Sequence, residues 1–501
     1  MKPETSSAAH DSLAVQLRSG LVVGERAGGI VAYRDIPYAA APVGNARFAA
    51  PRPAEAWDGA LDTRTRGANA PQRVRSVPGL DAAPLIGTGW IADDAYLTLD
   101  VLRPADDSQA LPVMVFIHGG GFVVGSKDAG VQDGSTFARD GIVYVAINYR
   151  LGIEGFLPIP GVPTNLGLRD MIAALEWVRD EIATFGGDPA NVTIFGESAG
   201  AMAIADLVTS PLAKGLFARA IVQSGHGGMT HDIGVAQRLV KKLAKLLKIS
   251  PDHAGFASVP PAATLDALET ISQPTTRLDL RDANGREPVF GISRFVPVHG
   301  DDVLPVPPLD ALKNGAGADI DLLIGSNAEE MNLYLVTSGV REKIGRLLSI
   351  FVLSRSHPRA WATLKAYGLG KRKAGYVLTD AMSDLVFRWP ARLFAEEHRG
   401  RTHVYEFDWQ SPRYDGQLGA AHGMELGFVF DSLATVTGPE GLCGEAPPQE
   451  LADRTHGIWV DFARDGSLPW PAFDRETRQV YRLAKGEVVH EPPMPCAPFL
   501  P

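Results

Sequence analysis

The sequence predicts an α/β protein whose central, mostly parallel and twisted β-sheet is flanked by helices. Over the first half of the chain, short apolar segments that are typical of buried strands alternate with longer amphipathic segments. The expected strands are 111–120, 141–150, 192–195 and 218–225, and the longest expected helix between them is 167–187. This alternation is typical of βαβ units, in which parallel strands pair beneath helices that cover both faces.

Two further strands and two helical stretches are expected in the second half of the chain. The segments 320–327 and 402–409 have the apolar character of strands that extend the same sheet. Residues from about 228 to 290 and from about 335 to 400 carry little strand signal, so we interpret them as helical cap regions over the sheet edge. A length of 501 residues allows several domains, but this organisation favours a single domain over residues 1–501.

Composition and charge exclude several classes of function. The chain has 48 Lys and Arg against 58 Asp and Glu, and this formal net charge of −10 disfavours nonspecific binding to nucleic acid. Cys443 and Cys496 are too few for a disulfide framework and lack metal-ligand spacing, although a single bridge between them stays open. The opening residues lack the apolar core of a signal peptide, and no apolar run approaches about 18 residues. We therefore expect a cytoplasmic protein with no membrane span.

The pentapeptide GESAG, at 196–200, places Ser198 between a strand and a helix. Residues 192–195 are expected as a short buried strand and residues 199–208 as a helix, with very few residues between them. A turn this tight is typical of a nucleophile elbow, which holds a serine hydroxyl exposed at the carboxyl end of a strand. The flanking glycines would let strand and helix approach closely, because a Cβ there would meet the neighbouring backbone. An ordinary glycine-rich turn is the alternative.

The sequence HGGGF, at 118–122, supplies a second backbone feature about eighty residues earlier. It closes the 111–120 strand, and its successive glycines allow backbone N–H groups to converge on a small anion without side-chain obstruction. We predict an oxyanion hole formed by the amides of Gly120, Gly121 and Ala199. A flexible glycine turn is the alternative.

His422 is the histidine that the sequence favours as the partner of Ser198. A serine hydroxyl near pH 7 needs a histidine to take its proton and an acid to orient that histidine; behind a nucleophile elbow the chain order is serine, acid, histidine. His422 lies among small residues in an expected loop between a strand and an apolar segment. His403 within a strand, His456 on a helical face and His357 before a proline are better explained as structural residues.

The acid that would orient the histidine is expected just beyond the 320–327 strand. The segment GSNAEEMNLYL, at 325–335, supplies both Glu329 and Glu330 there. Carboxylates at the start of a helix are commonly capping or solvated residues, so these positions alone leave both candidates open.

Together these motifs resemble the type B carboxylesterase family, the cholinesterase-like branch of the α/β-hydrolases that includes bacterial para-nitrobenzyl esterases. The resemblance covers roughly residues 20 to 475 and implies an α/β-hydrolase fold with helical cap insertions. It rests on motifs in the family's order: IPYAAAPVGNARFAAPRP (36–53), HGGGF (118–122), INYRLGIEGFL (147–157), NLGLRDMIAALEWVRDEIATFGGDPANVTIFGESAG (165–200), FARAIVQSG (217–225), GSNAEEMNLY (325–334) and GAAHGMELGFVF (419–430).

The resemblance implies roles for individual residues. It implies that Ser198 is the nucleophile, His422 the general base and Glu330 the orienting carboxylate, since Glu330 matches the acid of the family's G-T-N-x-x-E-G pattern. It also supports the oxyanion hole predicted above. Glu197 resembles a buried family acid that stabilises positive charge on the histidine, and Ser224 resembles a serine that hydrogen-bonds beside the site.

The sequence departs from the family pattern at three points. The segment DDAYLTLDV, at 93–101, has Tyr96 where secreted members carry a disulfide-forming cysteine, which fits a reducing compartment. Met331 replaces the family glycine after the acid, so the local turn is expected to differ and Glu329 stays a substitute for the orienting role. No tryptophan-lined choline site is evident, which argues against a cholinesterase.

The resemblance implies hydrolysis of carboxylic esters through an acyl-enzyme intermediate, with a small-molecule ester as the partner. No metal or organic cofactor is expected, because every chemical role is assigned to a protein group. An amidase or carbamate hydrolase with the same groups stays an alternative, and so does a non-catalytic binding protein on the same fold. The physiological ester and the oligomeric state are left open.

Residues in three regions are expected to line the substrate pocket. These regions are the 75–90 loop, the segment around Phe290 and Phe295, and cap residues near Phe351 and Phe387. Aromatic residues at such places also serve as core, so the alternative is a structural role for each of them.

Overall fold

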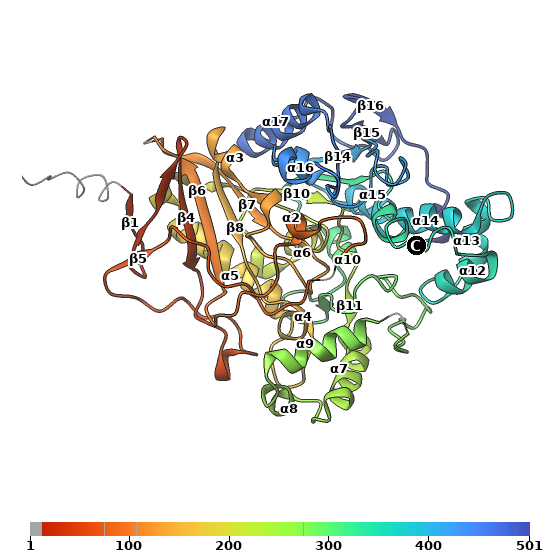
Figure 1. Cartoon of the computed structure of the whole chain (residues 1–501), viewed down its shortest axis with the longest axis horizontal. Helices are drawn as coiled ribbons and strands as arrows, with labels where there is room; N and C mark the ends of the chain where they lie inside the picture. The colour runs from red at the N-terminus through yellow and green to blue at the C-terminus, as the bar shows by residue number, and fades with distance from the viewer. Residues whose placement is uncertain (1–12, 75, 107, 274, 501) are drawn as a thin grey trace, which may run out of the picture.

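The computed structural model describes residues 13–74, 76–106, 108–273 and 275–500. An 11-stranded sheet runs through the molecule (Figure 1), and its strands pair in the order β16-β15-β14-β13-β10-β9-β7-β8-β6-β4-β3. From β15 to β8 all neighbours in this order are parallel, whereas the strands at both edges pair antiparallel. The mostly parallel sheet predicted from the sequence is therefore confirmed.

Each strand expected from the sequence is present near its predicted bounds. The sheet strands are β3 (Glu25–Ala27), β4 (Ile30–Pro37), β6 (Thr98–Pro104), β7 (Leu111–Ile117), β8 (Val143–Ile147), β9 (Gly187–Glu197), β10 (Arg219–Gln223), β13 (Asp321–Asn327), β14 (Thr402–Phe407), β15 (Gln479–Arg482) and β16 (Glu487–His490). Smaller pairings join β1 (Ala14–Gln16), β2 (Leu21–Val23) and β5 (Ala60–Asp62), and β11 (His231–Asp232) with β12 (Val298–His299).

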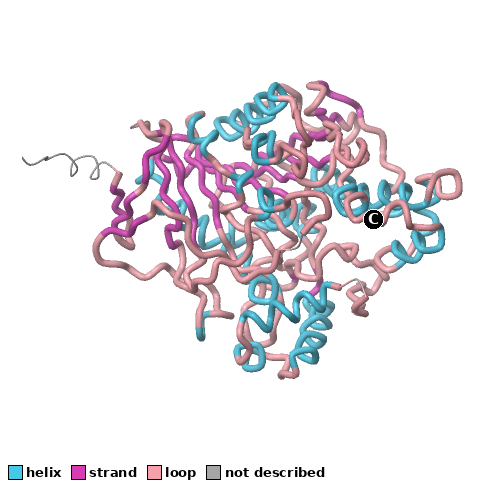
Figure 2. Tube along the Cα trace, in the orientation of Figure 1, coloured by secondary structure: helices cyan, strands magenta, loops and turns pink. Residues whose placement is uncertain are grey.

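Alternate residues of β7 reach opposite faces of the sheet, because side chains along a strand alternate with a period of two. Val115 and Ile117 belong to the apolar core that α5 (Leu166–Glu181) also fills, whereas Phe116 belongs to a second core with α17 (Gln449–Asp465). Figure 2 shows the helices, in cyan, on either side of the strands, in magenta. Burial on both faces explains why the central strands are continuous apolar runs in the sequence.

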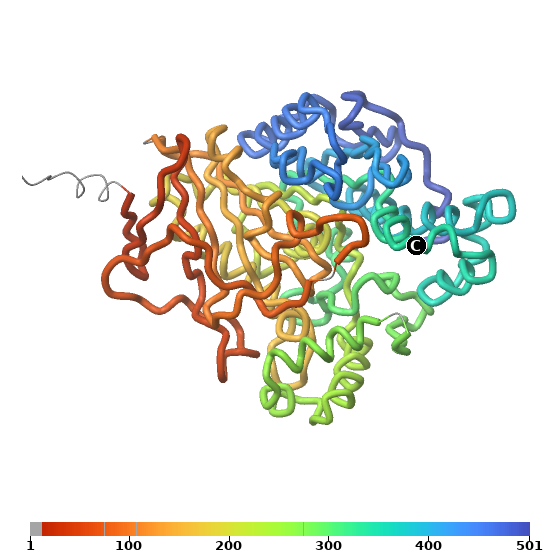
Figure 3. The backbone as a smooth tube through the Cα atoms, in the orientation of Figure 1, coloured from red at the N-terminus to blue at the C-terminus, as the bar shows by residue number. Residues whose placement is uncertain are grey.

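The two stretches predicted as caps are helical. The first contains α7 (Ile233–Leu247), α8 (His253–Ala257) and α9 (Pro261–Ser272). The second contains α12 (Arg346–Ser354), α13 (Ala360–Ala366), α14 (Ala374–Ser383), a π-helix (Asp384–Arg388) and α15 (Trp389–Glu397). Figure 3 shows the segment of α12 and α13, in teal, at the edge of the molecule. The assignment of the chain to a single domain stays a prediction.

Shorter helices lie between the strands along the chain. They are α2 (Ala83–Ile86), α3 (Ser135–Arg139), α4 (Gly152–Phe156), α6 (Ala199–Thr209), α10 (Pro308–Lys313), α11 (Asn332–Leu335) and α16 (Leu426–Val429). Cys443 and Cys496 are buried and unpaired, so the single bridge that the sequence left open is not formed. Within the described ranges, no helix is long and apolar enough to cross a membrane.

The predicted site residues follow the carboxyl ends of neighbouring strands. His118 directly follows β7, Ser198 follows β9, Glu330 lies three residues beyond β13, and His422 lies in the chain after β14. Because these strands are parallel and only β10 separates them in the sheet, their carboxyl ends lie along one edge. Ligands of open α/β sheets bind at this edge.

Asp206 is an uncompensated buried acid in α6, the helix that begins after Ser198. It is almost fully buried, and its Oδ1 has no hydrogen-bond partner in the described part of the chain. Burial raises the pKa of Asp206 well above its ordinary value. The folded state therefore holds this proton more tightly than the unfolded state. The protonated Asp206 contributes fully to the stability of the fold below about pH 3.8, and that contribution is lost as the pH rises.

We predict that Asp206→Asn makes the protein more stable than the wild type at neutral and alkaline pH. The neutral amide removes the free energy of burying or protonating the acid, which amounts to about 2 kcal/mol at pH 8. Urea unfolding of both proteins between pH 4 and pH 8 measures the difference, which should grow as the pH rises.

The exposed Asp58 provides the matched control, because Asp58→Asn removes the same charge from the surface. This variant should track the wild type across the pH range. An Asp206→Asn protein whose advantage over the wild type does not grow with pH contradicts the prediction.

Candidate active site

Ser198 lies in a strained turn between β9 and α6. Its φ of 56° and ψ of −123° are unusual for a residue with a side chain, and such conformations cluster at functional sites. A Cβ on Gly200 would lie 2.0 Å from the carbonyl oxygen of Ile117, and one on Gly196 would lie 2.5 Å from the same atom. Only glycine therefore fits on either side of the serine, as the sequence predicted.

Ser198, His422 and Glu330 form one hydrogen-bonded chain. The Nε2 of His422 lies 2.8 Å from the Oγ of Ser198, and its Nδ1 lies 2.7 Å from the Oε2 of Glu330. The other carboxylate oxygen of Glu330 accepts a hydrogen bond of 2.7 Å from the amide of Asn327. Glu330 is fully buried, so its carboxylate can fix the ring with the proton on Nδ1 and leave Nε2 facing the serine.

The structure separates the two carboxylates that the sequence could not distinguish. Glu329 contacts the backbone of the loop that carries His422, where its Oε2 accepts a 2.9 Å hydrogen bond from the amide of Ala420. Met331, in place of the family glycine, is buried, and its amide donates to the Oγ of Ser383 at 3.0 Å. The turn after Glu330 therefore forms without glycine, and the acid that reaches His422 is Glu330.

Glu197 places a second carboxylate beside the histidine. Its Oε1 lies 3.2 Å from the Nε2 of His422, and burial raises the pKa of Glu197 from 4.5 to about 8. Burial lowers the pKa of His422, but the carboxylates of Glu197 and Glu330 outweigh this effect and raise that pKa from 6.5 to about 9. The site therefore favours a positive charge on the imidazole ring.

The loop that contains the HGGGF motif (118–122), which we call the glycine loop, lies against Ser198 and has free backbone donors. Gly120 and Gly121 have φ values of 103° and 63°, which favour glycine. No acceptor within the described residues receives a hydrogen bond from the amides of Gly120, Gly121 or Ala199. All three residues line the same cavity as Ser198, so their N–H groups are available to an anion bound there.

The base of the glycine loop is held by side chains from two other segments. Gln72 forms two hydrogen bonds to Gly125, accepting from its amide at 2.7 Å and donating to its carbonyl at 2.9 Å. The amide of Lys127 donates to the Oδ1 of Asn148 at 2.9 Å. A Cβ on Gly125 would lie 2.5 Å from the carbonyl oxygen of Gly119, so the loop closes tightly on itself.

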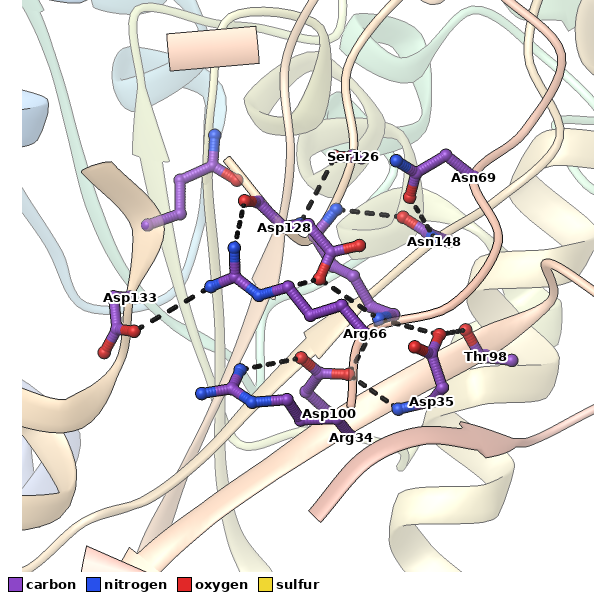
Figure 4. A network of polar contacts seen from close by, with 12 residues as sticks. Arg34, Asp35, Arg66, Asn69, Thr98, Asp100, Ser126, Asp128, Asp133 and Asn148 are labelled. Atoms are coloured by element: carbon purple, nitrogen blue, oxygen red, sulfur yellow. Dashed lines mark hydrogen bonds and ion pairs between the residues drawn. The ribbon is translucent and has the colours of Figure 1, made fainter. Parts of the chain in front are cut away.

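The side chain of Lys127 is fully buried among three carboxylates. These carboxylates, Asp35, Asp100 and Asp128, are labelled in Figure 4. The Nζ of Lys127 lies 2.7 Å from Asp100, 2.9 Å from Asp35 and 3.5 Å from Asp128. Burial lowers the pKa of Lys127, but these carboxylates outweigh burial and raise it above its ordinary value. This cluster was not predicted from the sequence, because a lysine in a loop is normally exposed and two of its three partners, Asp35 and Asp100, are far away in the chain.

The cavity beside Ser198 has a volume of ≈ 270 Å³ and a mostly apolar wall. Residues of the 75–90 loop line it as expected, including Leu80 and Leu85. Phe387 and Tyr334 pack on the His422 ring at centroid distances of 4.6 Å and 5.7 Å. Tyr334 was not predicted, although it follows the acid by four residues in the sequence.

Three of the predicted pocket aromatics lie elsewhere. Phe351 is 61% exposed on α12 and does not line the cavity, because the face of α12 that carries it points to solvent. Phe290 lines a second cavity, and Phe295 is a buried core residue. Their neighbours Val289 and Ile292 line the site instead.

The hydroxyl of Ser224 is buried and has no hydrogen-bond partner among the described residues, so its role beside the site stays a prediction. Its backbone is fixed in the left-handed region, with a φ of 53°, by a hydrogen bond from its amide to the carbonyl of Gly325. The structural interpretation of His456 is consistent with its bonds to Val429 and Asp140, and His403 packs on the edge of Trp470.

His357 also lies outside this site, and its Nε2 contacts the carbonyl oxygen of Phe499. Among the residues with described positions, no cluster of three or more His, Cys, Asp or Glu side chains could hold a metal ion. The groups that meet at the site are a serine hydroxyl, an imidazole, two carboxylates and a set of backbone donors.

Comparison with known proteins gives one consistent result. The model of the Carboxylesterase family matches residues 11–494. The chain is 33% identical over 488 residues to the para-nitrobenzyl esterase of Bacillus subtilis (strain 168), covering 94% of each chain. It is 33% identical over 461 residues to the phenmedipham hydrolase of Pseudarthrobacter oxydans, covering 89% of this chain and 90% of the other.

Solved structures agree with the sequence comparison. A PNB esterase superimposes with a TM-score of 0.83 at 31% identity, covering 96% of this chain and 97% of the other. A carboxylesterase of Geobacillus stearothermophilus, solved at pH 6.2, gives a TM-score of 0.81 at 30% identity, covering 96% and 98%. The similarity in fold and in sequence therefore extends over nearly the whole chain.

We predict that Lys127→Met lowers the free energy of unfolding by about 3 kcal/mol. The substitution keeps the apolar stem but removes the cation that three carboxylates share. Arg34 and Arg66 still pair with Asp100 and Asp128, but at 3.4 Å each, and a buried charge that loses its main partner is strongly destabilising. Urea unfolding at pH 7 measures the loss, and Lys127→Arg should retain part of the stability.

Lys485→Met is the control for this substitution. Lys485 lies 3.9 Å from Glu487, and both side chains are more than half exposed. Such surface pairs contribute less than about 1 kcal/mol. If the two methionine variants lose the same amount, the buried cluster does not stabilise the loop as described.

Proposed function

Because this chain belongs to the carboxylesterase family, we propose that it hydrolyses carboxylic esters through a Ser-His-Glu triad and an acyl-enzyme intermediate. Ester hydrolysis itself follows from the family and from its esterase relatives. The observation that carries the finer proposal is the continuous hydrogen-bonded chain from Ser198 through His422 to Glu330 at 2.8 Å and 2.7 Å.

In the first half of the reaction, the Oγ of Ser198 attacks the carbonyl carbon of the ester. His422 takes the hydroxyl proton on Nε2 as the new C–O bond forms, and the carbonyl electron pair moves onto oxygen. The resulting oxyanion accepts hydrogen bonds from Gly120, Gly121 and Ala199. When the carbonyl re-forms, the bond to the alcohol oxygen breaks and that oxygen receives the proton from His422.

In the second half, water replaces the alcohol and the same groups repeat their roles. His422 takes a proton from water as its oxygen attacks the acyl carbon, and the oxyanion again lies against the three amides. Collapse of this intermediate breaks the bond to the Ser198 oxygen, which recovers its proton from His422. The products are the carboxylic acid and free enzyme.

Two carboxylates support the histidine during these proton transfers. Glu330 accepts from Nδ1 and holds the ring so that Nε2 faces Ser198. Glu197 lies 3.2 Å from Nε2 and favours the imidazolium that forms in each half-reaction. A carboxylate held beside a developing cation in a buried site stabilises the transition state more than it would in water.

The shape and polarity of the cavity favour apolar esters. Its wall is mostly apolar, and its volume of ≈ 270 Å³ suits a small acyl or aryl group. Phe387 and Tyr334 cover the His422 ring and limit the access of water to it. The names of its relatives suggest para-nitrobenzyl esters and phenmedipham as further test substrates.

Substitution of the nucleophile tests the proposal. Ser198→Ala should lower kcat for p-nitrophenyl butyrate by at least about 10⁴-fold, because no acyl-enzyme can form. A fluorophosphonate probe should label the wild type and leave this variant unlabelled.

Ser210→Ala is the control, since Ser210 closes α6 at its other end and its hydroxyl donates to Val303. This variant should keep near wild-type activity. Full turnover by Ser198→Ala would overturn the proposal. If the probe labels the wild type but the wild type does not hydrolyse p-nitrophenyl butyrate, another ester is the substrate.

Glu197→Gln should shift the acid limb of the pH profile to lower pH. His422 must be neutral to take the serine proton, and Glu197 is one of the carboxylates that raise the pKa of His422 toward about 9. Removing this charge should lower the midpoint of kcat/KM by at least about half a pH unit and lower the plateau by about 10-fold.

Glu329→Gln is the matched control, because Glu329 is a neighbouring carboxylate that bonds the backbone of Ala420 instead of His422. Its pH profile should keep the wild-type midpoint. Equal shifts in the two variants, or a shift of Glu197→Gln to higher pH, would contradict the assigned role of Glu197.

A further inference from the structure

The segment 341–373 has a charge opposite to that of the rest of the protein. It contains nine Lys and Arg and a single acidic residue, Glu342, which gives it a formal net charge of +8. Since the whole chain carries −10, the remaining residues carry −18. A basic segment within an acidic protein creates a local attraction for anionic surfaces.

Helix α12 in this segment exposes its apolar side chains. Leu347, Leu348 and Phe351 are 83%, 48% and 61% exposed, whereas Ser349 and Leu353 are buried. Residues three or four positions apart share a helix face, so Leu347 and Phe351 lie together on the outer side. Surface helices normally bury such a face, which makes α12 an exception.

Helix α13 adds an exposed tryptophan to the same region. Trp361 is 54% exposed, and the Nζ of Lys365 lies 5.9 Å from the centre of its ring. Helices α12 and α13 pack against each other, and Figure 1 places both at the outer end of the molecule. We call residues 343–373 the α12–α13 tip.

Most cations of the α12–α13 tip have no carboxylate partner. Among residues with described positions, Arg372 pairs with Asp380 and Lys373 pairs with Glu342. Six exposed cations have no carboxylate within ion-pairing distance in the described part of the chain: Lys343, Arg346, Arg355, Arg359, Lys365 and Lys371. Their charge is therefore available to an external anion.

We propose that the α12–α13 tip docks on the surface of an anionic lipid bilayer. Leu347, Phe351 and Trp361 would enter the boundary between headgroups and acyl chains, while the unpaired cations face lipid phosphates. A nucleic acid would match the charge but leave the apolar side chains in water. Two tips facing each other would bring like charges together, which argues against a symmetric dimer at this surface.

The α12–α13 tip lies, along the chain, between two residues that line the active-site cavity. Tyr334, on α11, precedes the tip, and α14 connects it to the π-helix that carries Phe387. Both aromatic rings pack on His422. Docking would therefore bring the cavity wall near a phase in which apolar esters dissolve, but the docking itself does not depend on the proposed hydrolysis.

Vesicle flotation of the full-length protein tests the proposal. Vesicles of phosphatidylcholine and phosphatidylglycerol, at about 7:3, should carry the wild type at low salt, and vesicles of phosphatidylcholine alone should carry at least about 10-fold less. Salt near 0.5 M should weaken the binding because it screens the cations. Quenching of tryptophan by brominated lipid should decrease in Trp361→Phe.

Two sets of exposed substitutions separate the apolar and the electrostatic contributions. Leu347→Ser with Phe351→Ser removes apolar contacts, and Arg346→Gln, Arg355→Gln, Arg359→Gln and Lys365→Gln together remove four charges. Each set should lower binding to anionic vesicles by at least about 10-fold. Hydrolysis of a soluble ester should stay unchanged, which distinguishes loss of docking from loss of the active site.

Helix α7 offers a matched control, because it is also basic but packs its apolar face, including Leu239 and Leu243, into the protein. Changing its four exposed lysines, Lys241, Lys242, Lys245 and Lys248, to glutamine removes the same charge as the tip set. Binding of this variant should stay within about threefold of the wild type.

Several outcomes would overturn the proposal. Absence of binding to anionic vesicles, or equal binding to neutral ones, would do so directly. An equal loss in the α7 variant would show that net charge, and not the α12–α13 tip, causes the binding. Self-association that Phe351→Ser abolishes, without any vesicle binding, would assign the surface to a second copy of the chain.

Discussion

The close approach of strand β7 to the turn around Ser198 is the constraint on which the site depends. The carbonyl oxygen of Ile117, at the end of β7, lies where a Cβ on Gly196 or Gly200 would collide. This contact holds Ser198 in a conformation that costs about 1–3 kcal/mol in isolation, and the packed sheet and α6 supply the free energy that maintains it. The same strand end leads directly into the glycine loop, so one contact relates the hydroxyl to the backbone donors around it.

Two groups of buried charges, around Lys127 and around His422, differ in their role. The cation of Lys127 is shared by carboxylates, and these ion pairs hold the cluster in one arrangement. Glu197 and Glu330 instead flank a histidine that must gain and lose a proton twice in each catalytic cycle. Buried ion pairs with good geometry resist rearrangement, whereas an imidazole between two carboxylates can change its charge. The glycine loop thus leads in the chain to a fixed ion-pair cluster and lines the same cavity as a titratable centre.

Sequence patterns predicted the features whose signals lie close together in the chain. They did not predict the features that depend on where a side chain points in the folded protein. The strands and the turn around Ser198 were predictable because their signals lie within about ten residues. The choice between Glu329 and Glu330 depends on which carboxylate turns inward after β13, and neither spacing nor composition contains that information. Lys127 could not be assigned, because two of its partners, Asp35 and Asp100, come from other strands. Its burial therefore depends on the assembled sheet.

Helix α12 departs from the usual rule that the apolar face of a surface helix is buried. An apolar helix in a cap normally packs its apolar residues against the rest of the protein, and cap residues near Phe351 were expected in the pocket. Burying a large apolar side chain contributes about 1.5–3 kcal/mol, so leaving Leu347 and Phe351 in water forgoes the stability that their burial would provide. The described part of the chain thus has an enclosed apolar surface around Ser198 and an open one on α12. An apolar ester must leave a phase that dissolves it before reaching the first, and the second lies in the chain between Tyr334 and Phe387, which line the cavity.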